Sequence, residues 1–164
     1  VKYIKNNNID NFLILSCRRT LTYTIYDKLK ENNIEVTNYL TTKKENIKLC
    51  NKLIISPDSI YKLDYPLKKY DFIWIDEGVS FMYYIGSHLL VDKNNRNNAI
   101  TVLEWLLINC KKLLITDADL NQSVIDFYLY YRSIRYCKLL KYNNFSYIKY
   151  NLFDDENNIL KNLE

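Results

Sequence analysis

The sequence predicts an α/β protein with a mostly parallel sheet and helices on both faces. Four short, uniformly apolar runs have the composition of strands buried on both faces, at 12–15, 53–55, 72–75 and 113–115. Helical stretches separate these runs, as parallel strands require, because each connection has to cross the sheet. The 164 residues contain no internal repeat or long linker. We therefore expect a single domain over residues 1–151 and a polar tail at 152–164.

The first elements follow from hydrophobic spacing. Residues 1–5 have the pattern of the end of a helix, and a turn at 6–11 leads to the strand at 12–16. Leu21, Ile25 and Leu29 then recur every four residues, which predicts an amphipathic helix over 18–32. Alternating apolar and polar residues at 34–39 indicate a second strand.

The later elements repeat the order of strand and helix. Pro57 closes the strand at 53–56, because proline cannot continue a ladder. The strand at 72–75 is followed by helices at about 79–90 and 99–111, with a polar loop at 92–98 between them. The strand at 113–115, a helix at 121–133 and a last strand at 145–150 complete the expected order, and the only histidine, His88, has no metal-ligand spacing around it.

Composition excludes several classes of protein. With two glycines the chain has no glycine-rich phosphate loop, neither GxxxxGK[ST] nor GxGxxG. No apolar run is long enough to span a membrane, and the net charge of +4 is well short of a basic-patch signature. The four cysteines lack CxxC or CxxH spacing and are too scattered for a disulfide framework. We expect reduced, mostly core thiols and an intracellular, reducing compartment.

Polar side chains follow four of the predicted strands at the point where each strand ends. These segments are Ser16-Cys-Arg-Arg19, Ser56-Pro-Asp-Ser59, Asp76-Glu77 and Thr116-Asp-Ala-Asp119. Any strand must end in something polar, but the carboxyl ends of parallel strands meet at one edge, where sites form in open sheets. The sequence therefore predicts a functional site at this edge.

Asp76 and Glu77 give the most specific local pattern. Four apolar residues followed by Asp-Glu form a Walker B pattern. In such a pattern the aspartate holds a hydrated Mg²⁺, and the glutamate orients or deprotonates the water that attacks the γ-phosphate.

The ordered set of motifs resembles one family. SCRRTL, SPDSIYKL, DEGV and TDADL follow one another as in superfamily 2 helicases, with Asp117 placed 41 residues after Asp76. The segments 13–21, 58–63, 76–79 and 117–120, with Asn151 after the last strand, are similar to the herpesvirus-type replication-origin-binding helicases and their relatives in large DNA viruses. The resemblance covers about residues 1–151 and implies a P-loop-NTPase-like, RecA-like first lobe.

The resemblance implies a role for each matched residue. Asp76 would be the Mg²⁺ ligand and Glu77 the catalytic base, with Mg²⁺ and ATP as the family's cofactors. Contacts to the backbone of single-stranded DNA would come from Arg18, Arg19 and Ser59. Thr116, Asp117 and Asp119 would couple the nucleotide state to the DNA path.

The sequence departs from the family in one large respect. The family's P-loop would lie just before Val1, and its second lobe, with the arginine finger, would lie downstream. We therefore expect a lobe truncated at its N-terminus, with doubtful nucleotide binding and no ATPase activity by itself. Its partners would be DNA and the missing remainder of the helicase, with no membrane.

A purely structural role remains an alternative for individual residues. Arg18 and Arg19 could simply be solvated at a helix start, although cations there oppose the helix dipole. Asp119 could be the N-cap of the helix at 121–133 rather than a functional group.

Two alternative functions also remain open. Glu77-Gly78 and Asp117-x-Asp119 fit the spacing of a Toprim-type metal domain for phosphoryl transfer, although Leu120-Asn121 replaces the usual glycine. The other alternative is a non-catalytic remnant that binds nucleic acid or protein, which the missing glycine-rich loop favours.

Overall fold

A five-stranded sheet forms the centre of the molecule. The structure is a computed structural model that describes residues 1–63, 67–87 and 93–132. All strand pairs are parallel, and the order is β2-β3-β1-β4-β5. The strands are β1 (Phe12–Ser16), β2 (Thr37–Asn38), β3 (Lys52–Ile55), β4 (Phe72–Asp76) and β5 (Lys112–Thr116). The predicted parallel sheet is therefore confirmed.

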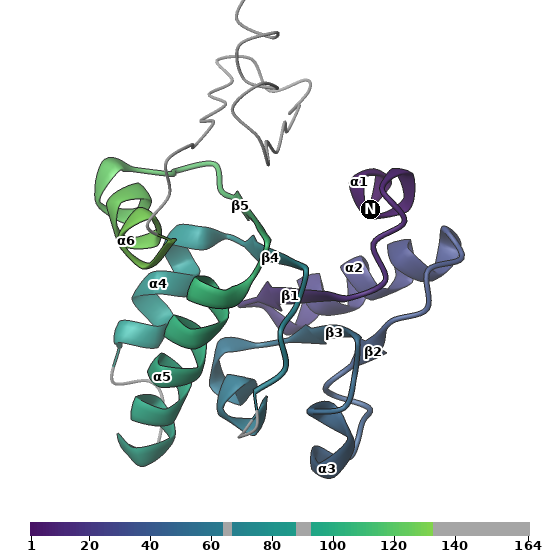
Figure 1. Cartoon of the computed structure of the whole chain (residues 1–164), viewed down its shortest axis with the longest axis horizontal. Coiled ribbons are helices and arrows are strands. Elements are labelled where there is room, and N and C mark those ends of the chain that lie inside the picture. The colour runs from purple at the N-terminus through teal and green to yellow at the C-terminus, as the bar shows by residue number, and fades with distance from the viewer. Residues whose placement is uncertain (64–66, 88–92, 133–164) are drawn as a thin grey trace, which may run out of the picture.

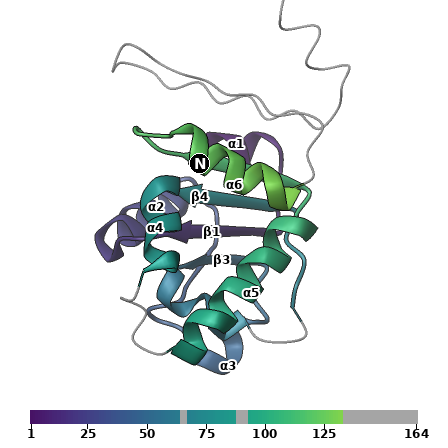
Figure 2. The ribbon, with the colours of Figure 1, turned by 90° about the vertical axis from the view of Figure 1, so that its left-hand side faces the viewer.

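Helices cover both faces of this sheet, as predicted (Figure 1). One face carries α1 (Lys2–Asn6) and α2 (Arg19–Glu31). The other carries α3 (Lys44–Ile47), the 3-10 helix η1 (Pro57–Leu63), α4 (Gly78–Gly86), α5 (Lys93–Asn109) and α6 (Gln122–Arg132). Figure 2 shows β4, β1 and β3 side by side, with α4, α5 and α6 on the near side.

Alternation along β1 divides the core into two layers. Leu13 and Leu15 point toward the layer beneath α4 and α5, whereas Phe12 and Ile14 point toward α1 and α2. All four side chains are fully buried, which is why the strand has no polar residue before Ser16.

The path of the chain creates a switch point between β1 and β4. The chain leaves β1 through α2 on one face toward β2, and it leaves β4 through α4 and α5 on the opposite face toward β5. In open parallel sheets such a reversal opens a crevice outside the carboxyl ends of the two strands. The segments after Ser16 and after Asp76 border this position.

Two elements differ from the sequence-based expectation. The predicted loop at 92–98 is wrong over most of its length, because α5 begins at Lys93. Asparagine-rich segments favour loops in isolation, but Ala99, Val102 and Leu106 pack into the core and stabilise the helix that this segment extends. The strand predicted at 34–39 is reduced to two residues, β2, which sits at the sheet edge and pairs only with β3.

Three of the four cysteines lie in the described part and are free thiols. Cys110 is buried, whereas Cys17 and Cys50 are half-buried, so the expected core location holds for one of them. Within the described ranges no helix is long and apolar enough to cross a membrane. Cys137, His88, the strand predicted at 145–150, Asn151 and the polar tail lie outside the described residues.

Candidate functional site

The last residues of three neighbouring strands form one row at the carboxyl edge of the sheet. Ser16 of β1 is aligned with Asp76 of β4, and Asp76 is aligned with Thr116 of β5. Side chains at one register position of a parallel sheet point to the same face. The structure thus brings together three motif segments that are far apart in the sequence, as the positions of the strand ends predicted.

A directed chain of hydrogen bonds holds the Asp76 carboxylate. The indole Nε1 of Trp74 donates to Thr116 Oγ1 at 3.0 Å. Thr116 Oγ1 in turn donates to Asp76 Oδ1 at 2.7 Å. Because an indole nitrogen can only donate, the hydroxyl proton of Thr116 is committed to Asp76. No sequence pattern distinguishes Trp74, because the direction of its side chain follows only from the strand register.

Burial is the main influence on the protonation of Asp76. It raises the pKa of the Asp76 carboxyl, and the nearby charges of Glu77 and Asp117 raise it further. The hydrogen bond from Thr116 opposes this shift, because it favours the ionised form. Thr116 therefore helps to keep a half-buried carboxylate charged.

Asp117 fixes the start of α4. Its Oδ2 accepts a hydrogen bond from the backbone N–H of Val79 at 2.8 Å, and its Oδ1 accepts one from the N–H of Asp119 at 2.7 Å. Glu77 occupies the N-cap position of α4 but makes no capping bond with its side chain. Asp117, from the loop after β5, therefore supplies the cap that Glu77 does not.

Gly78 allows the close contact between α4 and β5. A Cβ atom at this position would lie 2.3 Å from Cγ2 of Ile115 and 3.8 Å from Cε2 of Tyr128. The hydroxyl of Tyr128 also donates to the Gly78 carbonyl at 3.2 Å. The sequence contained this glycine, but its purpose depends on a contact that only the folded structure shows.

Glu77 has an unusual backbone and an ionic partner. It lies in the left-handed region with φ 55° and ψ 61°, which costs a residue with a Cβ about 1–2 kcal/mol. Its Oε2 lies 3.2 Å from Nε of Arg18, whose side chain is 67% exposed. In the part of the chain that the structure describes, no donor meets this buried oxygen in hydrogen-bonding geometry, so the contact with Arg18 is Coulombic. Exposed ion pairs of this kind are worth about 0.2–1 kcal/mol.

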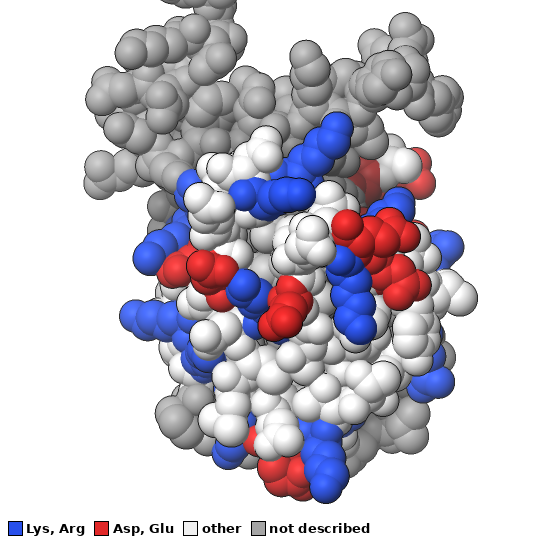
Figure 3. Space-filling view, turned by 90° about the vertical axis from the view of Figure 1, so that its right-hand side faces the viewer, with Lys and Arg blue, Asp and Glu red and all other residues white. Residues whose placement is uncertain are grey.

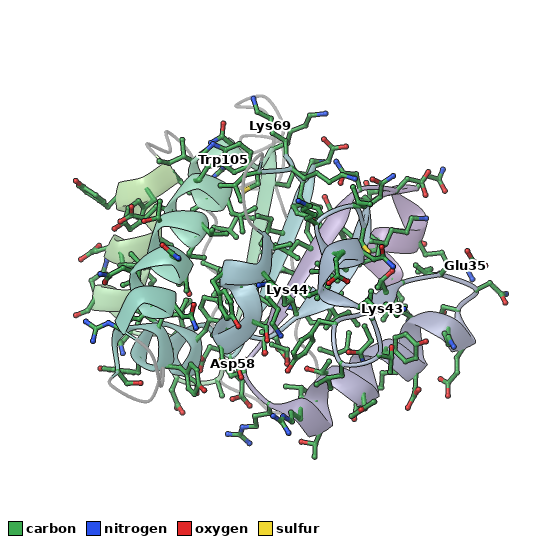
Figure 4. All side chains as sticks on the ribbon, turned by 90° about the horizontal axis from the view of Figure 1, so that it is seen from below. Glu35, Lys43, Lys44, Asp58, Lys69 and Trp105 are labelled. Carbon is green, nitrogen blue, oxygen red and sulfur yellow. The ribbon has the colours of Figure 1, made fainter. Side chains whose placement is uncertain are left out.

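A second polar group lies beyond β3. The hydroxyl of Ser56 donates to the Asp58 carboxylate, and Lys62 Nζ donates to Ser59 Oγ at 3.0 Å. Burial raises the pKa of Tyr39, which lies beside this group. Figure 4 shows Asp58 at the opposite end of the molecule from Lys69 and Trp105, as expected for a residue at the carboxyl edge.

The predicted nucleic-acid residues differ in accessibility. Arg18 and Arg19 are exposed at the start of α2. Ser59 is only 4% exposed and already accepts from Lys62, so Lys62 carries the accessible charge at this position. Asp119 is exposed but does not cap α6, because Asn121 Oδ1 accepts from the N–H of Val124 instead.

Cys17 lies among the carboxylates, in surroundings that disfavour its thiolate. Burial raises the pKa of the Cys17 thiol to about 12, and the charges of Glu77 and Asp76 contribute to the shift. The thiol is therefore protonated at neutral pH, whereas metal binding and nucleophilic attack need the thiolate.

The available oxygen atoms suit a hydrated Mg²⁺ ion better than a closed metal cage. In the part of the chain that the structure describes, no group of three or more potential ligands could hold a metal ion. Mg²⁺ usually keeps several waters and binds one or two carboxylates together with substrate phosphates. Asp76 has one oxygen engaged by Thr116, and Ser16 Oγ, beside it in the row, is buried without a hydrogen-bond partner. These residues fit a water-mediated Mg²⁺ ion.

The fold and the site together define a class. An all-parallel sheet with helices on both faces, and with acidic and basic side chains at its carboxyl edge, is the architecture of RecA-like α/β proteins. The chain belongs to the family described as "Origin of replication binding protein", which matches residues 2–146.

A curated relative agrees with this family. The chain is 24% identical over 129 residues to the "Replication origin-binding protein" of Human herpesvirus 7 (strain JI). The match covers 78% of this chain and 16% of that relative, so the chain spans less than a fifth of the relative's length. No solved structure matches the chain.

Proposed function

We propose that this chain serves DNA replication as part of the motor lobe of an origin-binding helicase. The carboxyl edge would bind a Mg²⁺–nucleotide through Asp76 and Glu77 and a nucleic-acid strand through Arg18 and Arg19. One observation carries the proposal: Arg18, from the segment after β1, lies 3.2 Å from Glu77, from the segment after β4, at the switch point of the sheet. Two motifs that would bind different ligands therefore meet at one switch point of the sheet, where sites form in open parallel sheets.

The nucleotide half of the proposal rests on the acidic residues. Asp76 is oriented by the hydroxyl of Thr116 and would hold the water shell of Mg²⁺. That ion neutralises charge on a transferring phosphoryl group. Glu77 would orient the attacking water. Since the chain has two glycines and no glycine-rich loop, the phosphates would be cradled by residues outside this sequence, and Thr116 and Asp117 would couple the nucleotide to the DNA path.

The nucleic-acid half rests on the start of α2. Arg18 is the N-cap of this 13-residue helix and Arg19 its first residue, so two exposed cations join the positive end of the helix dipole. The broad face formed by α1 and α2 is a poorer candidate, because basic and acidic side chains are interspersed on it (Figure 3). The backbone of a single-stranded nucleic acid would therefore follow the carboxyl edge of the sheet rather than this face.

Substitution of the two arginines tests the nucleic-acid half. With a labelled single-stranded oligonucleotide, Arg18→Gln and Arg19→Gln are each expected to weaken binding by about 3–10-fold and to reduce the salt slope by about one. Lys28→Gln and Lys30→Gln, in the last turn of α2, remove the same charge and should change the affinity by less than about twofold. Equal losses in all four variants would contradict a defined strand path.

An ATPase assay tests the nucleotide half. We expect the chain alone to show no Mg²⁺-dependent hydrolysis of ATP, because it lacks a phosphate-binding loop. If the purified chain hydrolyses ATP and Glu77→Gln abolishes this hydrolysis, the proposal that residues outside this sequence cradle the phosphates is refuted. Our second candidate function is a non-catalytic binding module. It would be supported if the chain binds the oligonucleotide but this binding does not respond to nucleotide, even with the remainder of the protein present.

The Toprim alternative has less support. That mechanism needs Asp117 and Asp119 as metal ligands beside Glu77. Both oxygens of Asp117 already accept backbone hydrogen bonds, from Val79 and Asp119. A metal ion would have to share the Asp117 oxygens with these two backbone N–H groups, one of which starts α4.

A further inference from the structure

The Arg18–Glu77 ion pair engages two side chains that would each serve a different ligand. Arg18 follows β1 and Glu77 follows β4, and these strands are neighbours in the sheet. We propose that a nucleic-acid phosphate competes with Glu77 for Arg18, so that a bound strand leaves the Glu77 carboxylate without its cationic partner. This inference rests on the proposed function and adds a regulation of the same site.

The geometry makes this contact easy to exchange. Nε of Arg18 and Oε2 of Glu77 are 3.2 Å apart, and no donor from residues 1–63, 67–87 or 93–132 reaches that oxygen in hydrogen-bonding geometry. The Arg18 side chain is 67% exposed, so a phosphate can approach it from solvent. A phosphate can accept two parallel hydrogen bonds from a guanidinium group, which is a better match than the single contact with Glu77.

Glu77 differs from the two carboxylates around it in how it is held. Asp76 accepts a hydrogen bond from Thr116, and Asp117 accepts two from backbone N–H groups. Among the described residues, the Oε2 atom of Glu77 has only the Coulombic contact with Arg18. Loss of Arg18 therefore changes the electrostatic surroundings of Glu77 while Asp76 and Asp117 keep their partners.

The backbone directs Glu77 toward this exchange. Its φ of 55° places it in the left-handed region, between the end of β4 and the first residue of α4. The Asp117 bond to Val79 and the close packing of Gly78 on Ile115 hold the neighbouring backbone. A strained residue persists where its surroundings determine it, and such residues gather at switch regions.

Competition for one arginine has a reciprocal consequence. If a phosphate displaces Glu77, then removal of the Glu77 charge must strengthen binding of the phosphate by the same coupling. Asp76 and Asp117 are acidic and cannot replace Arg18 as a partner, and the next cation, Arg19, interacts with Tyr39 instead. Nucleic-acid affinity therefore reports the pair directly, without nucleotide or metal.

The test measures binding of the whole chain to a labelled single-stranded oligonucleotide. Glu77→Gln is expected to raise the affinity by about 3–10-fold, since it frees Arg18. Glu31→Gln, at the exposed end of α2, makes the same change in net charge and should raise the affinity by less than about twofold. In an Arg18→Gln background, Glu77→Gln should raise the affinity for the oligonucleotide no more than Glu31→Gln does.

The outcomes distinguish a failure of the competition for Arg18 from a failure of the proposed nucleic-acid binding. Suppose that the wild-type chain binds the oligonucleotide and that this binding depends on Arg18. Competition is then overturned if Glu77→Gln raises the affinity no more than Glu31→Gln does. It is also overturned if Glu77→Gln still raises the affinity more than Glu31→Gln does in the Arg18→Gln background. If the chain does not bind, or Arg18→Gln has no effect, the nucleic-acid half of the proposed function fails and the inference fails with it. As a second readout, the NMR signal of the Arg18 Nε–H should respond to lower concentrations of inorganic phosphate in Glu77→Gln than in the wild-type chain. Circular dichroism checks that each variant is folded.

Discussion

Replacement of Gly78 with alanine is expected to lower the free energy of unfolding by about 1–3 kcal/mol. The new Cβ would lie 2.3 Å from Cγ2 of Ile115, far inside van der Waals contact. Either α4 or β5 would have to move, and the move would disturb the hydrogen bond from Tyr128 to the Gly78 carbonyl. Urea denaturation monitored by circular dichroism gives the change in stability.

The second glycine provides a matched control. A Cβ at Gly86 would meet no atom within 4 Å. Gly86→Ala, at the last residue of α4, is therefore expected to leave stability unchanged or to raise it by up to about 1 kcal/mol. In Ile115→Ala, which removes the clashing methyl group, Gly78→Ala should cost less than in the wild type. Equal effects of the two glycine substitutions would show that steric contact is not the cause.

Replacement of Thr116 with valine is expected to cost about 1–3 kcal/mol at neutral pH. Valine has nearly the same shape, but it removes the hydroxyl that accepts from Trp74 and donates to Asp76. The Trp74 indole N–H loses its acceptor, and the half-buried carboxylate loses its donor. Urea midpoints of the variant and the wild type at neutral pH measure the loss.

The cost of Thr116→Val should depend on pH. Burial places the pKa of folded Asp76 above its unfolded value of about 3.9. The folded state therefore retains a proton that the unfolded state has lost, and this contribution to stability is complete below the unfolded pKa and disappears as the pH rises through the folded pKa. Without the Thr116 hydroxyl the folded pKa rises further, because that bond favours the ionised form.

The deficit of the variant should accordingly be largest at neutral pH and should shrink on acidification, as Asp76 becomes protonated. Thr24→Val is the matched control, because Thr24 is exposed on α2 and its hydroxyl donates only to the Thr20 carbonyl. Its effect should be small and the same at every pH. A Thr116→Val deficit that does not change with pH would show that the Asp76 charge is not involved.

Strand β1 could be predicted because it is buried on both faces. Four consecutive apolar residues at Phe12–Leu15 leave no polar face for a solvent-exposed helix or sheet. The start of α5 could not be predicted, because the residues at 93–98 have weak helix preference and are helical through the packing of Ala99 and Val102. The short elements α3 and η1 have no periodicity long enough to recognise.

The position of the site could be predicted, but its internal contacts could not. Parallel strands place Ser16, Asp76 and Thr116 at one edge whatever their order in the sheet. The ion pair of Arg18 with Glu77 requires β1 and β4 to be neighbours, and the hydrogen bond from Trp74 requires the register of β4 with β5. Strand order and register depend on tertiary packing, which no single motif contains.

The bond between Asp117 and the Val79 N–H has a consequence for local stability. The first turn of α4 is held from outside the helix, by a carboxylate that belongs to the loop after β5. Hydrogen exchange at Val79 is therefore expected to require release of the Asp117 bond as well as fraying of the helix end. Loss of the Asp117 bond would free the backbone next to Glu77, so a disturbance of the loop after β5 is expected to speed hydrogen exchange in the segment that carries Glu77.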